Sequence, residues 1–133
     1  MQFAPYIFFF ALMAALTLAV CQNTAAPVTQ ERVRYYGVQT RPFDNELVQF
    51  HVTLSGTKSS EQVARYPECA AAQYNLIRGF GFAGHVSTRI GQQADRLSVD
   101  AVYKISRSLP QGTKTIDAEV VADACARDNI PMV

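Results

Sequence analysis

Two histidines and three acidic residues fall at alternating positions of predicted strands, on the sides opposite the apolar residues. They are His51, His85, Asp100, Asp117 and Glu119. If the strands lie in one sheet, these side chains meet on its exposed face, where imidazoles and carboxylates are suitable zinc ligands and a vacant position activates water. The pattern predicts a metal-binding domain or a metal-dependent hydrolase that uses His51, His85, Asp100 and Glu119. No HExxH or other fixed ligand spacing occurs, so solvated polar positions on an antiparallel sheet are the interpretation that the sequence favours.

A second candidate site lies near the start of the domain, where aromatic and basic residues gather. It consists of Tyr35, Tyr36 and Phe43 together with Arg32, Arg34 and Arg41. Because aromatic residues and arginine are enriched at binding hot spots, this group predicts a contact strip for an envelope protein or a glycan. A strand or a sheet edge whose aromatic side chains cover the core is the alternative, and it is the interpretation that the sequence favours.

The chain has three cysteines, and their odd number is explained if Cys21 is used apart from the other two. Residues 18–21 (LAVC) resemble the lipobox of bacterial lipoproteins, in which the cysteine becomes the lipidated first residue after cleavage. Val20 is larger than the small residue that this pattern prefers, so ordinary cleavage after Ala19 stays open. Cys69 and Cys125 then form an even pair, for which an oxidising compartment predicts a disulfide. The alternative is a reactive thiol at Cys69, near a helix start.

The amino-terminal segment before Cys21 is apolar and uncharged. Residues 1–30 contain no Asp, Glu, Lys or Arg, and Thr17 is the one polar residue in the run 7–20. As a helix this run spans about 21 Å, which is short of the roughly 30 Å hydrocarbon core of a bilayer. We therefore expect residues 1–20 to be a signal peptide, although no Lys or Arg precedes the run. Residues 21–31 are expected to form a polar tether, and residues 32–133 a single domain of about 100 residues.

Period-two alternation predicts the strands that position these side chains. The clearest alternation is in residues 97–106, and further strands are expected at residues 47–54, 82–90 and 114–121. Short polar connections at residues 91–96 and 107–113 predict that successive strands pair antiparallel. Residues 33–38 are a further candidate strand, whose pairing the pattern leaves open.

One main helix is predicted over residues 67–78, because Pro67 is tolerated best in a first turn and Gly79 is a C-cap signal. Its apolar stripe consists of Cys69, Ala72, Leu76 and Phe80. Residues 123–128 add one helical turn that contains Cys125. The predicted fold class is α+β, with one main helix packed on an antiparallel sheet of about four strands. The predicted disulfide ties this helix to the far end of the sheet.

The formal net charge is +1, from 12 basic and 11 acidic residues that are mixed along the chain. This balance excludes the basic footprint of a nucleic-acid-binding protein and gives no support for attraction to acidic lipids. The sequence contains no GK[ST] phosphate loop and no GxSxG motif, so no cofactor is predicted. A non-enzymatic role is favoured.

Three stretches carry a resemblance to a wider group of proteins. Residues 69–82 (CAAAQYNLIRGFGF), residues 100–103 (DAVY) and residues 115–120 (TIDAEV) resemble small exported proteins of alphaproteobacteria. The resemblance covers the domain from about residue 43 onward, implies an envelope location and transfers no catalytic residue. These patterns together predict a lipid-anchored envelope protein that faces the periplasm and serves as an interaction or structural module. An unmodified secreted domain is the alternative.

Overall fold

The computed structural model of the chain describes residues 32–109 and 114–132. The predicted signal peptide at residues 1–20 and the predicted tether at residues 21–31, which includes Cys21, therefore lie outside the described residues. Among the residues that the structure describes, no helix is long and apolar enough to cross a bilayer. These residues form an antiparallel sheet of five strands and two helices, which confirms the α+β class with one strand more than expected.

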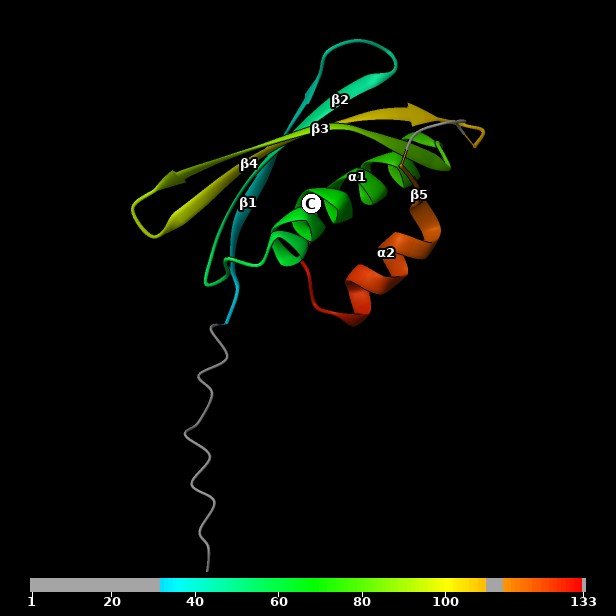
Figure 1. Cartoon of the computed structure of the whole chain (residues 1–133). Helices are drawn as coiled ribbons and strands as arrows, with labels where there is room; N and C mark the ends of the chain where they lie inside the picture. Colours follow the sequence, from blue (N-terminus) through cyan, green and yellow to red (C-terminus); the bar gives the residue numbers. More distant parts are fainter. Residues whose placement is uncertain (1–31, 110–113, 133) are drawn as a thin grey trace, which may run out of the picture.

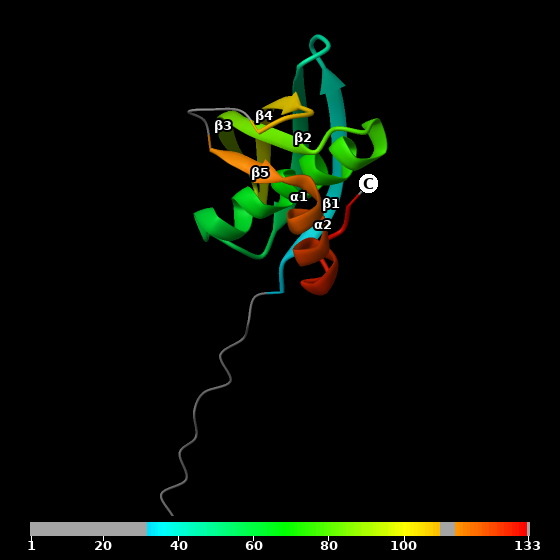
Figure 2. The same cartoon turned by 90° about the vertical axis from the view of Figure 1, so that its right-hand side faces the viewer.

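Both helices lie on the same side of the sheet, with α2 packed on α1 (Figures 1 and 2). The elements along the chain are β1 (Arg34–Pro42), β2 (Leu47–Ser55), α1 (Ser60–Arg78), β3 (Phe82–Gln93), β4 (Arg96–Ser106), β5 (Thr115–Asp117) and α2 (Ala118–Arg127). In space the strands follow the order β1-β2-β4-β3-β5, and each neighbouring pair is antiparallel. The sheet thus has one face covered by helices and one face that neither α1 nor α2 covers.

The predicted strand at residues 47–54 is confirmed as β2, and its alternation separates the two faces. Its buried residues are Val48, Phe50, Val52 and Leu54, and the residues between them along residues 47–53 are partly exposed. Residues directly opposite on neighbouring strands share a face. Val99 and Ala101 on β4, which lie opposite Val52 and Phe50, are buried in the same way. The hydrophobic core therefore lies between this face and α1.

The order of the strands corrects two expectations. The candidate strand at residues 33–38 belongs to β1, which pairs with β2 and supplies the fifth strand. Pairing of successive strands is confirmed for β3 and β4 but is wrong for β4 and β5. Both edges of β4 are occupied, by β2 and β3, so β5 adds to the free edge of β3, where Ile116 lies opposite Ala83.

Helix α1 begins before Pro67, the predicted start. Ser59 caps it by accepting a hydrogen bond from the N–H of Gln62, and Pro67 lies inside the helix. Val63 and Tyr66, in the turns before Pro67, are each only 2% exposed. Burial of these two side chains in the core outweighs the loss of the backbone hydrogen bond that proline cannot donate.

The carboxyl end of α1 lies where the sequence predicts it. Gly79 adopts the left-handed conformation, with φ of +77°, and its N–H donates to the carbonyl of Leu76. The predicted apolar stripe is confirmed at Cys69 and Ala72, which are buried, and is wrong at Leu76, which is 42% exposed. The turns before Pro67 explain the difference, because their buried side chains set which side of α1 faces the sheet.

The predicted strand at residues 114–121 is wrong beyond Asp117. The Asp117 carboxylate accepts hydrogen bonds from the N–H groups of Glu119 at 3.1 Å and Val120 at 3.3 Å, which is an N-cap that starts α2. The alternation that suggested a strand has no structural meaning at Val120, which is 64% exposed. A local bond from side chain to backbone thus competes successfully with strand pairing, and α2 contains most of the helical turn expected at residues 123–128.

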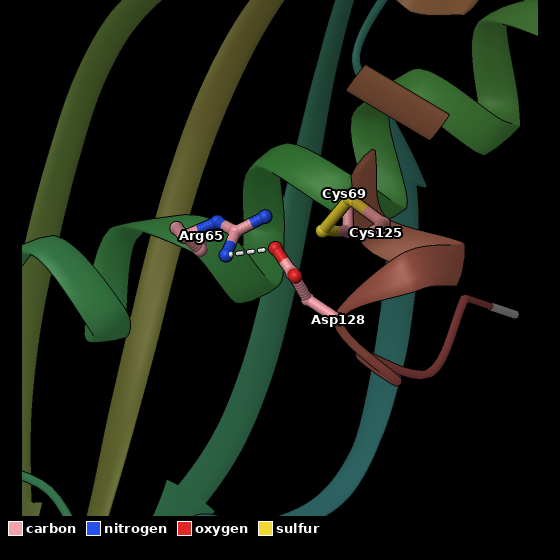
Figure 3. Close-up of a disulfide and its surroundings, with 4 residues drawn as sticks. All are labelled: Arg65, Cys69, Cys125 and Asp128. Atoms are coloured by element: carbon pink, nitrogen blue, oxygen red, sulfur yellow. Dashed lines mark ion pairs between the residues drawn. A yellow bond between two sulfur atoms is a disulfide. The ribbon is translucent and has the colours of Figure 1, made fainter. Parts of the chain in front are cut away.

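The predicted disulfide between Cys69 and Cys125 is present, and it joins the two helices (Figure 3). Their Cα atoms lie 5.9 Å apart and both residues are buried. The expectation that the bond reaches the far end of the sheet is wrong, because Cys125 belongs to α2. The bond also leaves no free thiol at Cys69. One turn away, the Arg65 guanidinium lies 2.7 Å from the Asp128 carboxylate.

Asn75 is a polar residue inside the packed layer of α1, and it gives a first prediction. It is fully buried, and neither Nδ2 nor Oδ1 of its amide has a hydrogen-bond partner among the described residues. Because an unsatisfied buried amide costs about 1–3 kcal/mol, Asn75→Leu is expected to raise the free energy of unfolding by that amount. Urea unfolding measures the change. Asn75→Asp, which buries a charge in the same shape, should act in the opposite direction, and a loss of stability with leucine would contradict the prediction.

Candidate functional site

The uncovered face of the sheet carries a row of polar side chains that crosses four strands. From β1 to β3 the row consists of Gln39, His51, Asp100 and Arg89, each directly opposite the next. The row beside it consists of the small residues Gly37, Thr53, Ser98 and Gly91. A Cβ atom at Gly91 would lie 2.9 Å from the Ser98 hydroxyl oxygen, so glycine there leaves room for this hydroxyl. The result is a polar surface with an acidic residue near its centre.

Asp100 is held in place by two neighbours on β2. One carboxylate oxygen lies 2.6 Å from Nδ1 of His51 and also accepts a hydrogen bond from Nε2 of Gln49 at 2.9 Å. The hydrogen bond with His51 has the largest effect on the pKa of Asp100 and lowers it below the usual 3.8. Partial burial raises this pKa, whereas the bond from Gln49 and the charge of Arg41 lower it further. The side chain is therefore a fixed, ionised acceptor.

The pair of His51 and Asp100 has the arrangement of a general base. With Nδ1 bound to the carboxylate, Nε2 of a neutral imidazole is available to accept a proton from a hydroxyl or a thiol. In the described part of the chain, the hydrogen bonds of the His51 side chain lead only to Asp100. Among the described residues, no hydroxyl or thiol is thus bound to His51. Its Nε2 is therefore available to a polar ligand.

The lowered pKa of Asp100 predicts how stability changes in acid. Because the folded protein binds this proton less readily than the unfolded chain, the stabilisation is complete above about pH 5 and is lost as the pH falls through the usual pKa and then the lowered one. The side chain is 34% exposed, so the contribution is at most about 1 kcal/mol. Urea unfolding between pH 7 and pH 3, each about one unit or more from the usual pKa, should show wild type and Asp100→Asn differing at neutral pH and converging in acid. The control, Ser98→Ala on the same face, should show no such convergence with wild type. If the free energies of unfolding of wild type and Asp100→Asn changed in parallel with pH, the prediction would be contradicted.

A shallow cavity of about 240 Å³ opens beside Asp100 on the same face. Its lining consists of Phe43, Gln49, Ser87, Arg89, Asp100 and Val102. Phe43 comes from the connection between β1 and β2, where the Asp44 carboxylate accepts hydrogen bonds from the N–H groups of Glu46 and Leu47. Its side chain is 60% exposed. The cavity thus offers a carboxylate, a guanidinium, an amide and an aromatic ring to a ligand.

The predicted aromatic and basic strip is divided by a β-bulge in β1. The register with β2 shifts after Tyr35, which faces the helices and packs edge-on against Tyr66, with ring centroids 4.7 Å apart. Tyr36 is exposed instead. The Arg96 guanidinium lies 3.8 Å from the centre of its ring, and its hydroxyl lies 3.0 Å from the hydroxyl of Ser55. Tyr35 is therefore a partly buried residue that packs against the core, and a continuous strip does not form.

The other members of the predicted strip are exposed at two ends of β1. Arg41 lies opposite Gln49, close to the cavity that Phe43 lines, and its charge acts on Asp100. Arg34 lies at the start of the strand, opposite Ser55. Arg41 and Phe43 thus border the polar row, whereas Arg34 belongs to a different part of the surface.

The four predicted metal ligands do not form one site. His51 and Asp100 are in contact, but His85 lies on the covered side of the sheet and Glu119 lies in the first turn of α2. His85 lies on the covered side because a second bulge, in β3, places it opposite the buried Tyr103. Within residues 32–109 and 114–132, no group of three or more His, Cys, Asp or Glu residues has the geometry to hold a metal ion.

His85 lines a separate cavity of about 220 Å³ between α1 and the edge of the sheet. Its Nε2 lies 2.6 Å from the Thr88 hydroxyl, and its ring packs edge-on against Tyr103. Burial, and then the charge of Glu68, raise the pKa of Tyr103. Glu68 was not among the predicted site residues, since only the packing of α1 on the sheet brings it to this cavity.

Two residues of the polar surface were missed although the sequence contains a signal for them. Gln49 and Arg89 occupy outward positions in the predicted strands 47–54 and 82–90. The signal for both is a polar side chain at an outward strand position, although neither residue type is a preferred metal ligand. Their contact with the same cavity depends on the order of the strands, which alternation does not predict.

The fold and this surface define a small α+β domain in which an antiparallel sheet is covered by helices on one face and presents polar side chains on the other. The family described as YNQ4 C-terminal domain matches residues 35–129, and the chain belongs to this family. The match includes both helices and all five strands except the first residue of β1. No curated protein and no solved structure matches the chain.

Proposed function

We propose that the domain is a non-enzymatic interaction module of a cell-envelope lipoprotein and that its uncovered sheet face binds an envelope partner. The observation that supports this most directly is the row Gln39, His51, Asp100 and Arg89, which crosses four strands on a face without a covering helix. The backbone hydrogen bonds of the sheet fix the Cα positions of such a row, and the contact between His51 and Asp100 also orients these two side chains. A rigid polar surface of this kind is suited to recognition.

The location in the envelope is supported by the amino-terminal segment and by the disulfide. The apolar run at residues 7–20, followed by Cys21, is typical of a lipoprotein precursor. The buried bond between Cys69 and Cys125 is typical of proteins in oxidising compartments, of which the bacterial periplasm is one. A lipid on Cys21 would hold the domain at the periplasmic surface of a membrane.

The partner that we favour is a glycan, with an envelope protein as the alternative. The cavity beside Asp100 combines a fixed acceptor with the guanidinium of Arg89 and the exposed ring of Phe43. Acceptors and donors that converge beside an aromatic ring match the alternating hydroxyl groups and apolar faces of a sugar. Asp100 needs no further partner to be held, so its remaining lone pairs are available to a ligand.

Photo-cross-linking in intact cells tests this function. A photoreactive amino acid at Ser98, on the uncovered face, should form an adduct, whereas the same group at Asp123, exposed on α2, should not. Arg89→Glu should abolish the adduct at Ser98, since it places a second negative charge opposite Asp100. Digestion with a glycan hydrolase or with a protease identifies the class of partner. Equal adducts at both positions, or none at Ser98, would overturn the proposal.

The metal-dependent alternative predicts a different result. If His51 and His85 served a metal site, purified protein would contain stoichiometric zinc that is lost in the His51→Ala/His85→Ala variant. Elemental analysis of protein purified without chelators measures this directly. We expect no stoichiometric metal, because His51 and His85 lie on opposite faces of the sheet.

A further inference from the structure

The net charge of +1 conceals a separation of charge between the helices and the sheet. Acidic residues outnumber basic ones on the two helices and their caps, where Glu61, Glu68, Asp117, Glu119, Asp123 and Asp128 stand against Arg65, Arg78 and Arg127. The excess of basic residues therefore lies on the strands and their connections. A sequence count does not show this difference, because the two groups are interleaved along the chain.

Part of this basic excess surrounds a cavity of about 640 Å³ at one end of the sheet. The cavity lies where β1 begins, β2 ends and the hairpin of β3 and β4 turns. Three cations line it, Arg32, Arg34 and Lys58, against one acid, Asp95. The ion pairs of the described chain join other residues, namely His51 with Asp100, Arg65 with Asp128, and Lys104 with Glu46. The three cations thus face the cavity without a carboxylate partner in the described residues.

The backbone holds these cations together. Gly56 has a φ of +83°, which favours glycine, and a Cβ atom there would clash with the carbonyl oxygen of Arg32. The segment that enters the domain therefore packs directly against the turn that follows β2. This contact brings Arg32 and Lys58 to the same cavity, although the two are distant in the sequence.

A fourth cation strengthens the positive potential at the rim. Arg96 stacks on the ring of Tyr36, whose hydroxyl lies 3.0 Å from that of Ser55, a residue of the cavity lining. The bond with Ser55 has the largest effect on the pKa of Tyr36 and lowers it. The charges of Arg96 and Arg34 also lower this pKa, whereas partial desolvation and the charge of Asp95 raise it.

The cavity lies at the end of the domain where the chain enters it from Cys21. Figure 1 shows the described chain starting at the end of β1 that is opposite its hairpin with β2. The ten residues between Cys21 and Arg32 reach at most about 35 Å. If Cys21 is lipidated, the cavity therefore stays within a short distance of the membrane surface.

We propose that the cavity lined by Arg32, Arg34 and Lys58 binds the phosphate group of an anionic lipid headgroup and orients the domain on its membrane. Arginine forks match the geometry of phosphate oxygens, and lysine supplies a compact positive charge. The choice of a lipid as the source of the phosphate rests on the proposed lipoprotein function. With this end at the membrane, the uncovered sheet face remains open to a partner.

Vesicle binding by the full chain carrying Cys21→Ser tests the proposal. This variant cannot be lipidated, so the result does not depend on the anchor. Co-sedimentation is measured with vesicles of mixed phosphatidylglycerol and phosphatidylcholine and with vesicles of phosphatidylcholine alone, which corrects for the apolar residues 7–20. We expect the anionic vesicles to bind more strongly. Arg32→Gln/Lys58→Gln should weaken this binding about 25-fold, since each cation near an anionic surface contributes roughly fivefold.

The matched control is Arg78→Gln/Arg107→Gln, which removes the same charge from exposed positions at the other ends of α1 and β4. Equal loss in both variants would overturn the proposal in favour of general charge attraction. A second arm titrates inorganic phosphate and follows the Gly56 amide by NMR. A Gly56 amide signal that saturates with inorganic phosphate, without a preference of the protein for anionic vesicles, would also overturn the lipid as the source of the phosphate. Loss of the cross-link at Ser98 would contradict the proposed role of the uncovered sheet face but would not affect vesicle binding. Failure of the proposed function can therefore be distinguished from failure of the lipid proposal.

Discussion

Replacing Cys125 with serine is expected to lower the free energy of unfolding by about 4 kcal/mol under oxidising conditions. The bond joins residues 56 positions apart, and closing so long a loop restricts the unfolded chain strongly. It is also the one covalent link between α1 and α2 in the described chain, and α2 has few contacts with the sheet beyond β5. Since small domains have a total stability of roughly 5–15 kcal/mol, the variant should be close to unfolding at physiological temperature.

Urea unfolding with and without reductant measures this effect. Reduction should bring wild type to nearly the stability of Cys125→Ser, because both then lack the bond. Arg65→Ala is a useful comparison, since it removes the neighbouring ion pair with Asp128 but keeps the disulfide (Figure 3). Both side chains of that pair are partly exposed, so a loss below about 1 kcal/mol is expected. A wild-type protein indifferent to reductant would contradict the prediction.

Phe50→Ala is expected to destabilise the domain by about 3–5 kcal/mol. Phe50 is fully buried on β2, and its ring packs edge-on against Tyr74 of α1, with centroids 5.7 Å apart, and against Tyr103 of β4 at 6.0 Å. Truncation would leave a cavity between the sheet and α1, and the surrounding β2 and β4 backbones are held by their hydrogen bonds and cannot close it. Thermal and urea unfolding measure the loss.

Phe43→Ala is the matched control, because it removes the same side chain from the same hairpin at a position that is 60% exposed. We expect its stability to change by no more than about 0.5 kcal/mol. Its effect should appear in partner binding instead, since Phe43 lines the cavity beside Asp100. Similar destabilisation by both variants would show that the core is not centred on Phe50.

Most strands of the fold could be predicted from alternation, which follows burial most clearly in β2 and β4, where the residues on one side are buried and those on the other are more exposed. The prediction fails where a local contact or a tertiary contact overrides the pattern. Asp117 ends β5 by capping α2, although the apolar residues continue to alternate as far as Val120. The early turns of α1 persist before Pro67, because Tyr66 is buried against Tyr35 from β1. A tertiary contact of this kind is not visible in the local sequence.

The candidate site was predicted only in part, because it depends on register. His51 and Asp100 were expected on the outward face, and the pairing of β2 with β4 brings them into contact. His85 was expected beside them, but a single bulge in β3 moves it to the covered face. A shift of one residue reverses the side of every side chain before it, and alternation alone does not reveal the shift.

By itself, the sequence determined the α+β class, most of the strand positions, the end of α1 at Gly79 and the pairing of Cys69 with Cys125, because these follow from short-range periodicity, local backbone preference and the cysteine count. The tertiary structure decided which strands are neighbours, which face His85 occupies and which charges lie together. The basic cavity at Arg32 and Lys58 is the clearest case, because its cations come from segments separated by two strands and meet only through the contact at Gly56. Electrostatic potential depends on distances in space, and a balanced count along the chain contains no information about them.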